Sequence, residues 1–303
     1  MSTGGILMMM AAADTAPPGP DFAAVTDSAT QPVLRAYDFD GTDITAVGNA
    51  YNLPITVGGN QEPLSLTALA PNEVAYLYRD NLLRGGLVKL SYDPDTGDWS
   101  QVGNTKTFTD LHQSNRVTAM SESRVAFCHK SVVVLETWDF DGSDWTKTGN
   151  STVSGDFQNP LRGLTNTTIT ARTFPTSQAQ WTFDGSDWSS GDPTRTTPTS
   201  NADFTMLSST LMLYANEGGT PGIAKYTVSG TSWVISGSAL GIPAMTWPSV
   251  AALSADEVVL ANKNTSTLRV YDVSGATPVA VGNSLALVTP EGNTVASFAF
   301  SIL

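Results

Sequence analysis

Acidic residues recur around a glycine in several segments of the chain, and their spacing fits two kinds of chemistry. Residues 138–150 read WDFDGSDWTKTGN and residues 37–49 read YDFDGTDITAVGN. The aspartates at 38, 40 and 43, and again at 139, 141 and 144, are spaced like the oxygen ligands of a calcium loop. Asp before Gly is also typical of a tight hairpin turn, because Gly accepts positive φ and the short side chain bonds to nearby backbone.

Further copies of the segment favour the turn over the metal site. Relatives begin at positions 92, 181, 226 and 271, and the last two lose most of the acids, as in YTVSGTS and YDVSG. What persists is Asp, Ser or Thr before Gly, and in four copies an aromatic residue follows: Trp99, Trp145, Trp188 and Trp233. We expect these segments to be turns between third and fourth strands, with the aromatic residue starting the outer strand and packing on its neighbour. The sequence therefore predicts no metal site and no cofactor.

The turn glycines show that the chain is one array of repeats. They stand at 41, 97, 142, 185, 230 and 275, which places them 43 to 56 residues apart, a period typical of stacked or radial repeats. Within residues 116–150, the stretches RVTAMS, RVAFCHK and VVVLETWDF and, after the turn, WTKTGN are short, bounded by turn residues and rich in β-branched and aromatic residues. Four strands per unit and six units predict an all-β, six-bladed β-propeller over residues 21–303.

The two ends of the chain supply the strands of one blade between them. The last turn glycine is followed by PVAVGN and then by one more strand, TVASFAFSIL. Before the first turn glycine there are only two strands, FAAVTDSA and PVLRAYDF, and DITAVG follows it. We therefore expect a four-stranded blade shared between the N- and C-terminal strands, which would close the ring.

Composition and motifs exclude several classes of function. The chain has 28 acidic and 15 basic residues and a net charge of −13, so nucleic acid is not expected as a partner. Cys128 is the only cysteine and there are two histidines, which rules out an intrachain disulfide and a conventional zinc cluster. We expect Cys128 to be buried and inert. No GxSxG, HExxH or P-loop occurs, so the sequence predicts a protein that is not an enzyme.

The candidate binding residues lie where loops of a propeller converge at one rim. Segments 79–86, 112–116, 129–131, 157–162, 216–222 and 244–248 are the expected rim loops. They carry most of the unusual side chains of the chain: Arg79, Arg84, His112, Arg116, His129, Arg162 and Trp247. A cluster of His112, Arg116 and His129 would bind an anion or a sugar acid, and the alternative is ordinary rim polarity.

Residues 1–20, MSTGGILMMMAAADTAPPGP, differ from the repeats and are expected to form a separate arm. The apolar stretch has no preceding Lys or Arg and is too short to span a bilayer, so we expect neither a signal peptide nor membrane insertion. The Pro-rich end is expected to be a hinge into the propeller. The expected anchor residues are Ile6, Leu7, Met8, Met9 and Met10.

The repeats, such as YDFDGTDITAVGN, resemble those of propellers in phage and bacterial proteins, and the start MSTGGILMMMAAA is similar to arms that phage virion proteins insert into a partner. This resemblance implies a non-enzymatic virion accessory protein of a head, neck or tail fibre, made in the host cytoplasm and present in several copies. Residues 1–20 would contact other virion proteins, and the rim a host-surface glycan or receptor. The alternatives are a bacterial lectin-like carbohydrate- or protein-binding propeller and a glycan-active enzyme.

Overall fold

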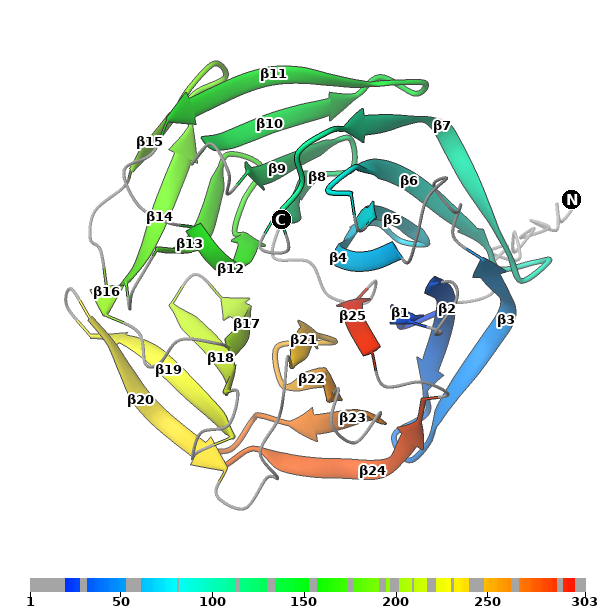
Figure 1. Ribbon diagram of the computed structural model, residues 1–303. Helices are drawn as coiled ribbons and strands as arrows, with labels where there is room; N and C mark the ends of the chain where they lie inside the picture. The colour runs from blue at the N-terminus through cyan, green and yellow to red at the C-terminus, as the bar shows by residue number, and fades with distance from the viewer. Residues whose placement is uncertain are drawn as a thin grey trace, which may run out of the picture.

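Six antiparallel sheets are arranged radially in a ring in the computed structural model (Figure 1). The structure describes residues 20–27, 32–52, 61–80, 82–112, 115–129, 134–152, 157–173, 177–190, 195–196, 202–208, 210–216, 222–229, 232–239, 248–262, 267–287 and 291–297. Each sheet is built on a four-stranded meander in chain order from the centre outward, apart from the sheet that joins the two ends of the chain; the blade 4 sheet has one short additional strand. The predicted six-bladed propeller is therefore confirmed.

The first three blades follow the chain from its first strand. Blade 1 contains β25 (Glu291–Ser297), β1 (Phe22–Asp27), β2 (Pro32–Phe39) and β3 (Ile44–Asn52). Blade 2 contains β4 (Gln61–Ala70), β5 (Glu73–Asp80), β6 (Gly85–Asp93) and β7 (Asp98–Phe108). Blade 3 contains β8 (Arg116–Ser121), β9 (Arg124–His129), β10 (Val134–Phe140) and β11 (Trp145–Thr152).

The other three blades complete the ring. Blade 4 contains β12 (Phe157–Gly163), β13 (Thr168–Thr173), β14 (Ser177–Phe183) and β15 (Trp188–Ser190), and β16 (Arg195–Thr196) also pairs with β14. Blade 5 contains β17 (Ala202–Ser208), β18 (Leu211–Asn216), β19 (Ile223–Ser229) and β20 (Ser232–Ala239). Blade 6 contains β21 (Ser249–Ala252), β22 (Glu257–Asn262), β23 (Thr267–Asp272) and β24 (Val279–Ala286).

Blade 1 combines strands from both ends of the chain. β25 is antiparallel to β1, with Phe22 opposite Ser297 and Ala24 opposite Val295. β25 occupies the innermost position of this blade, as β4 does in blade 2. The contribution of this pairing to the closure of the ring stays a prediction.

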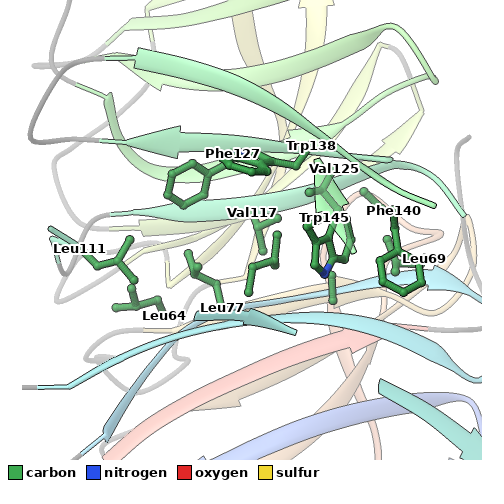
Figure 2. Packing of buried hydrophobic residues seen from close by; sticks show 13 residues of the cluster. Leu64, Leu69, Leu77, Leu111, Val117, Val125, Phe127, Trp138, Phe140 and Trp145 are labelled. Carbon is green, nitrogen blue, oxygen red and sulfur yellow. The ribbon is translucent and has the colours of Figure 1, made fainter. Parts of the chain in front are cut away.

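The core consists of apolar layers between consecutive blades, which we call seams and name by the blades that they join. Figure 2 shows the 2–3 seam, where Leu64, Leu77 and Leu111 of the blade 2 side face Val117 and Phe127 of blade 3. Because a blade is covered on both faces, the second strand of a blade reads as a continuous apolar run; β5 and β9 are examples. Cys128 is buried in the 3–4 seam, as expected.

The Asp-Gly segments are turns between third and fourth strands, as predicted. Asp141 Oδ1 accepts hydrogen bonds from the backbone N–H groups of Ser143 and Asp144, at 2.9 and 2.8 Å. These bonds hold the pKa of the Asp141 carboxyl below its usual value. The following Trp145 ring lies 5.1 Å from the ring of Phe140, one strand inward. The carboxylate is thus occupied by its own turn.

The Gly-Asn that ends the repeated motif joins three of the turns to the preceding blade. Asn104 of blade 2 donates its backbone N–H to Ser143 O (2.6 Å) and its Nδ2 to Asp144 Oδ1 (2.9 Å) in the blade 3 turn. A Cβ on Gly103, whose φ is +67°, would clash with Ser143 O, so the close approach requires glycine. We call this arrangement the latch. It recurs with Asn49 on the blade 2 turn and with Asn283 on the blade 1 turn.

Among the residues that the structure describes there is no helix long and apolar enough to cross a membrane.

Candidate functional site: an arginine-rich mouth of the central channel

Three of the predicted binding residues lie close together on strands of blades 2, 3 and 4. Arg116 is the first residue of β8, Arg162 lies near the end of β12, and Arg79 lies near the end of β5. β8 and β12 are neighbours around the channel, and Gly163 N donates to Thr118 Oγ1 at 2.8 Å. The guanidinium of Arg116 interacts electrostatically with those of Arg162 and Arg79. We call these three arginines, with Asp203, the arginine mouth.

Asp203, in β17, is the acidic partner within this group. Its two carboxylate oxygens lie 2.6 and 2.7 Å from Arg162 Nη2, and they also accept the backbone N–H groups of Phe204 and Val250, each at 2.9 Å. Arg162 Nη2 reaches Val250 O as well, at 3.4 Å. One ion pair therefore connects β12 of blade 4, β17 of blade 5 and β21 of blade 6.

Arg116 carries its charge in a poorly solvated position. Burial lowers the pKa of its guanidinium to about 10, the neighbouring Asp203 acts in the opposite direction, and Arg162 adds to the lowering. At neutral pH the group is still protonated. Its Nη1 donates to Asn115 O at 2.7 Å, and Arg79 Nη1 donates to Leu111 O at 3.5 Å. These carbonyl groups orient the two guanidinium groups.

Three guanidinium groups are gathered at the mouth, in a chain whose net charge is −13. Guanidinium groups bind carboxylates, sulfates and phosphates through paired N–H donors, and the interaction strengthens where water is excluded. The arrangement is therefore suited to an anion. Asp203, which already accepts bonds from one side chain and two backbone amides, is poorly placed to act as a general base.

The other predicted residues have different surroundings. Arg84 forms an ion pair with Asp80 (2.8 Å) in the turn between β5 and β6, where the buried Asp80 also accepts the N–H groups of Leu82 and Arg84. The carbonyl of His112 accepts the N–H of Asn115, and the ring of His129 lies edge-on to Phe127 at 5.7 Å. Trp247 and the anchor residues Ile6, Leu7, Met8, Met9 and Met10 lie outside the described residues.

The prediction that the binding residues occupy loops was wrong for four of them. Arg79, Arg116, His129 and Arg162 lie in strands, because the strands extend to the rim. The segment FQNPLR, expected to be a loop, is most of β12. A proline is tolerated there because one edge of this innermost strand faces the channel, and the register of β12 shifts between Gln158 and Leu161.

Asp203 was missed in the sequence because it is a single acid in the otherwise unremarkable strand ADFTMLS. Aligning the first residues of the innermost strands would have found it, since Asp203 occupies the position that Arg116 has in β8, two residues before a threonine. The described residues contain no group of three His, Cys, Asp or Glu side chains that would hold a metal ion.

Comparisons with known proteins support the fold. No family model and no curated protein matches the chain. A structurally similar protein of unknown function from Desulfotomaculum acetoxidans has a TM-score of 0.58 and 10% identity, over 91% of this chain and 98% of its own. A candidate 6-phosphogluconolactonase from Bacteroides fragilis has a TM-score of 0.59 and 8% identity, over 94% and 99%.

A periplasmic gluconolactonase from Pseudomonas aeruginosa is similar too, with a TM-score of 0.53 and 11% identity over 91% of this chain and 85% of its own. At these identities the similarity concerns the propeller fold, which is shared by proteins of unrelated function. The chain thus shares the propeller fold with these proteins.

Proposed function

We propose that this protein is a non-enzymatic binding propeller, which takes the acidic group of a saccharide at the arginine mouth and is displayed on a phage virion. The observation that supports this most directly is the gathering of Arg79 and Arg162 near Arg116, with Arg162 bonded to the carboxylate of Asp203. A carboxylate-bearing sugar would place its acid group on the guanidinium groups and its hydroxyls along the rim. The acidic body would restrict attraction of anions to this mouth.

The virion part of the proposal rests on the sequence. The apolar arm in residues 1–20 and the resemblance of the repeats to phage propellers support it. Removing residues 1–20 is expected to leave a folded, cooperative propeller that no longer enters particles, as seen by electron microscopy of purified particles. Particles that still carry the shortened protein would contradict anchoring by the arm.

A second function is favoured by the structural neighbours. Two of the similar proteins are named as lactonases acting on gluconolactone or its 6-phosphate. The arginine mouth would suit the acid or phosphate of such a substrate. In this chain the described carboxylate at the mouth is occupied by Arg162, which is why we place binding ahead of hydrolysis.

One experiment separates these functions. Isothermal titration with glucuronate, and with methyl glucoside as the uncharged control, is expected to detect binding of the acid alone. Arg116→Gln should weaken it at least tenfold, because a charge-assisted hydrogen bond in a dry site is lost. Arg84→Gln, on the same rim but paired with Asp80, is the matched control and should have no effect.

Two results would overturn the binding proposal. Equal affinity for glucuronate and methyl glucoside, or an Arg116→Gln variant that binds as the parent does, would show that the mouth is not an anion site. Turnover of 6-phosphogluconolactone above the spontaneous rate, abolished by Arg116→Gln, would establish the lactonase function instead.

A further inference from the structure

The 4–5 seam lacks several features that join other blades, beginning with the latch, whose Asn–Asp pair is missing from the 5–6 seam as well (Ser238 and Thr277). In blade 3 the latch glycine, Gly149, stands four positions after Trp145, the residue that follows the turn. Blades 1, 2, 5 and 6 have a glycine at the same spacing. The residue after this glycine is Asn in blades 1, 2, 3 and 6. Blade 4 reads WSSGD, so its glycine stands three positions after Trp188 and is followed by Asp192. On the receiving side, blade 5 has Ser232 where blades 1 to 4 have Asp. Both halves of the Asn–Asp pair are thus absent from the sequence at this seam.

The face that blade 4 turns toward blade 5 is polar. The buried apolar cluster of this seam takes Leu164 alone from the described residues of blade 4, whereas blade 5 provides Phe204, Met206, Met212, Tyr214, Ala224, Tyr226 and Trp233. Blade 3, by contrast, provides Met120, Ala126, Cys128 and Leu135 to the next seam. Contact of a polar face with an apolar one stabilises less per unit area than contact of two apolar faces.

Two buried polar side chains on this face of blade 4 are incompletely satisfied. Thr170 and Gln178 are 1% and 2% exposed, and Thr170 Oγ1 and Gln178 Oε1 have no hydrogen-bond partner. Gln178 Nε2 approaches Met212 Sδ of blade 5 at 3.4 Å, a weak interaction. Each orphan atom costs free energy that is recovered when the seam separates and water enters.

The inner edge of the seam is held differently from its neighbours. At the 2–3 and 3–4 seams a threonine hydroxyl of one innermost strand accepts an N–H of the next: Thr67 from Ala119 and Thr118 from Gly163. Arg162 occupies the equivalent position in β12 and cannot accept a bond. It donates instead to Asp203, in the ion pair described above.

We propose that the ring is built to open at the 4–5 seam and that the Arg162–Asp203 ion pair is the clasp that keeps it closed. The missing latch, the polar face with its orphan atoms and the substitution of an arginine for a threonine all coincide at this seam. Opening separates Arg162 from Asp203 and so takes the arginine mouth apart. This inference rests on the packing of the blades and holds whatever ligand the mouth takes.

Alkylation of single thiols tests the proposal in the full chain. In a Cys128→Ala background, Thr170→Cys and Ala224→Cys place a thiol on either side of the 4–5 seam, and both positions are at most 1% exposed. Ala75→Cys and Ala215→Cys, in the 2–3 and 5–6 seams, and Cys128 of the parent, in the 3–4 seam, are matched buried controls. Under native conditions the thiols at 170 and 224 should react with iodoacetamide at least tenfold faster than the controls.

The clasp is tested by Arg162→Gln, which should speed alkylation at 224 at least fivefold further and leave the controls unchanged. Arg124→Gln is the matched variant, since it breaks an ion pair within blade 3, with Asp139. Equal reactivity at all seams, or fastest reaction at another seam, would overturn the opening at 4–5. An unchanged rate at 224 in Arg162→Gln would overturn the role of the clasp.

Discussion

The 2–3 and 4–5 seams are formed by equivalent strands, yet they are stabilised by different interactions. The 2–3 seam has apolar residues on both faces (Figure 2). It also has a latch from Asn104 to the blade 3 turn and a hydroxyl that bonds the inner edges. The 4–5 seam has one apolar face among its described residues and an ion pair. Buried orphan atoms occur at both seams: Trp145 Nε1 in the 2–3 seam, and Thr170 Oγ1 and Gln178 Oε1 in the 4–5 seam. The difference teaches that a propeller of one repeat can distribute its stability unevenly around the ring.

The largest effect is expected where the chain ends meet. Deleting residues 291–303 removes β25 and leaves β1 as an unpaired inner edge in blade 1. We expect loss of the cooperative unfolding transition in urea, which the deletion of any latch would not cause. A soluble variant with a transition close to that of the parent would show that the shared blade is dispensable.

Adding a side chain to the latch glycine of the 2–3 seam is expected to be the most damaging point change. In Gly103→Val the side chain would meet Ser143 O and the Phe140 ring, at a φ that disfavours any side chain. We expect a loss of about 3 kcal/mol or more in the free energy of unfolding, measured with urea. Gly142→Ala, also at positive φ but with open space around it, is the control and should cost only about 1 kcal/mol.

Exchanging the polar and apolar residues of two seams tests the comparison directly. Leu135 of blade 3 and Gln178 of blade 4 occupy equivalent positions in the third strand, three residues before Trp138 and Trp181 respectively. Leu135→Gln should cost about 3 kcal/mol, because it buries an amide in the 3–4 seam. Gln178→Leu should stabilise by about 1 kcal/mol, because it removes an orphan oxygen. Destabilisation by Gln178→Leu in a thermal melt would contradict our reading of the 4–5 seam.

The side chain of a single latch should matter less. Asn104→Ala removes the exposed bond to Asp144 but keeps the backbone bond to Ser143. We expect a loss of about 0.5–1 kcal/mol. Asn49→Ala and Asn283→Ala, at equivalent latches, should give similar values in the same urea titration, and a large spread would show that the latches are not equivalent.

The smallest effect is the response of the turns to acid. Backbone N–H groups lower the pKa values of Asp40, Asp141 and Asp184. A carboxyl with a lower pKa in the folded state contributes stability above its unfolded pKa of about 3.9, and loses it as the pH falls through the folded value. The melting temperature, measured between pH 6 and 2, should therefore decrease less steeply below pH 4 for the variant with Asn at all three positions than for the parent. Identical slopes would show that these turns do not couple to pH.

The sequence was sufficient for the fold because the repeat is carried by turn chemistry that is local. Asp141, Gly142 and Trp145 specify a hairpin through contacts with their sequence neighbours. The number of such hairpins in the sequence, six, gives the number of blades. The arginine mouth is different, because Arg116 and Arg162 meet only through the ring and through a register shift in β12 that no local signal announces. The polar 4–5 seam was equally hidden, since Thr170 and Gln178 look like solvent-facing residues of an alternating strand.

A repeat that forms latches on both sides resembles a subunit with two different, complementary binding surfaces. One end is the Gly-Asn and the other is the Asp-containing turn, so contacts run head to tail, as in a heterologous interface of a cyclic oligomer. The last repeat binds the first, through Asn283 and Asp43, as the first binds the second and the second binds the third. A duplicated unit would therefore bring both complementary ends with it, and the number of blades would be limited by the rotation per unit instead of by contacts special to any one blade.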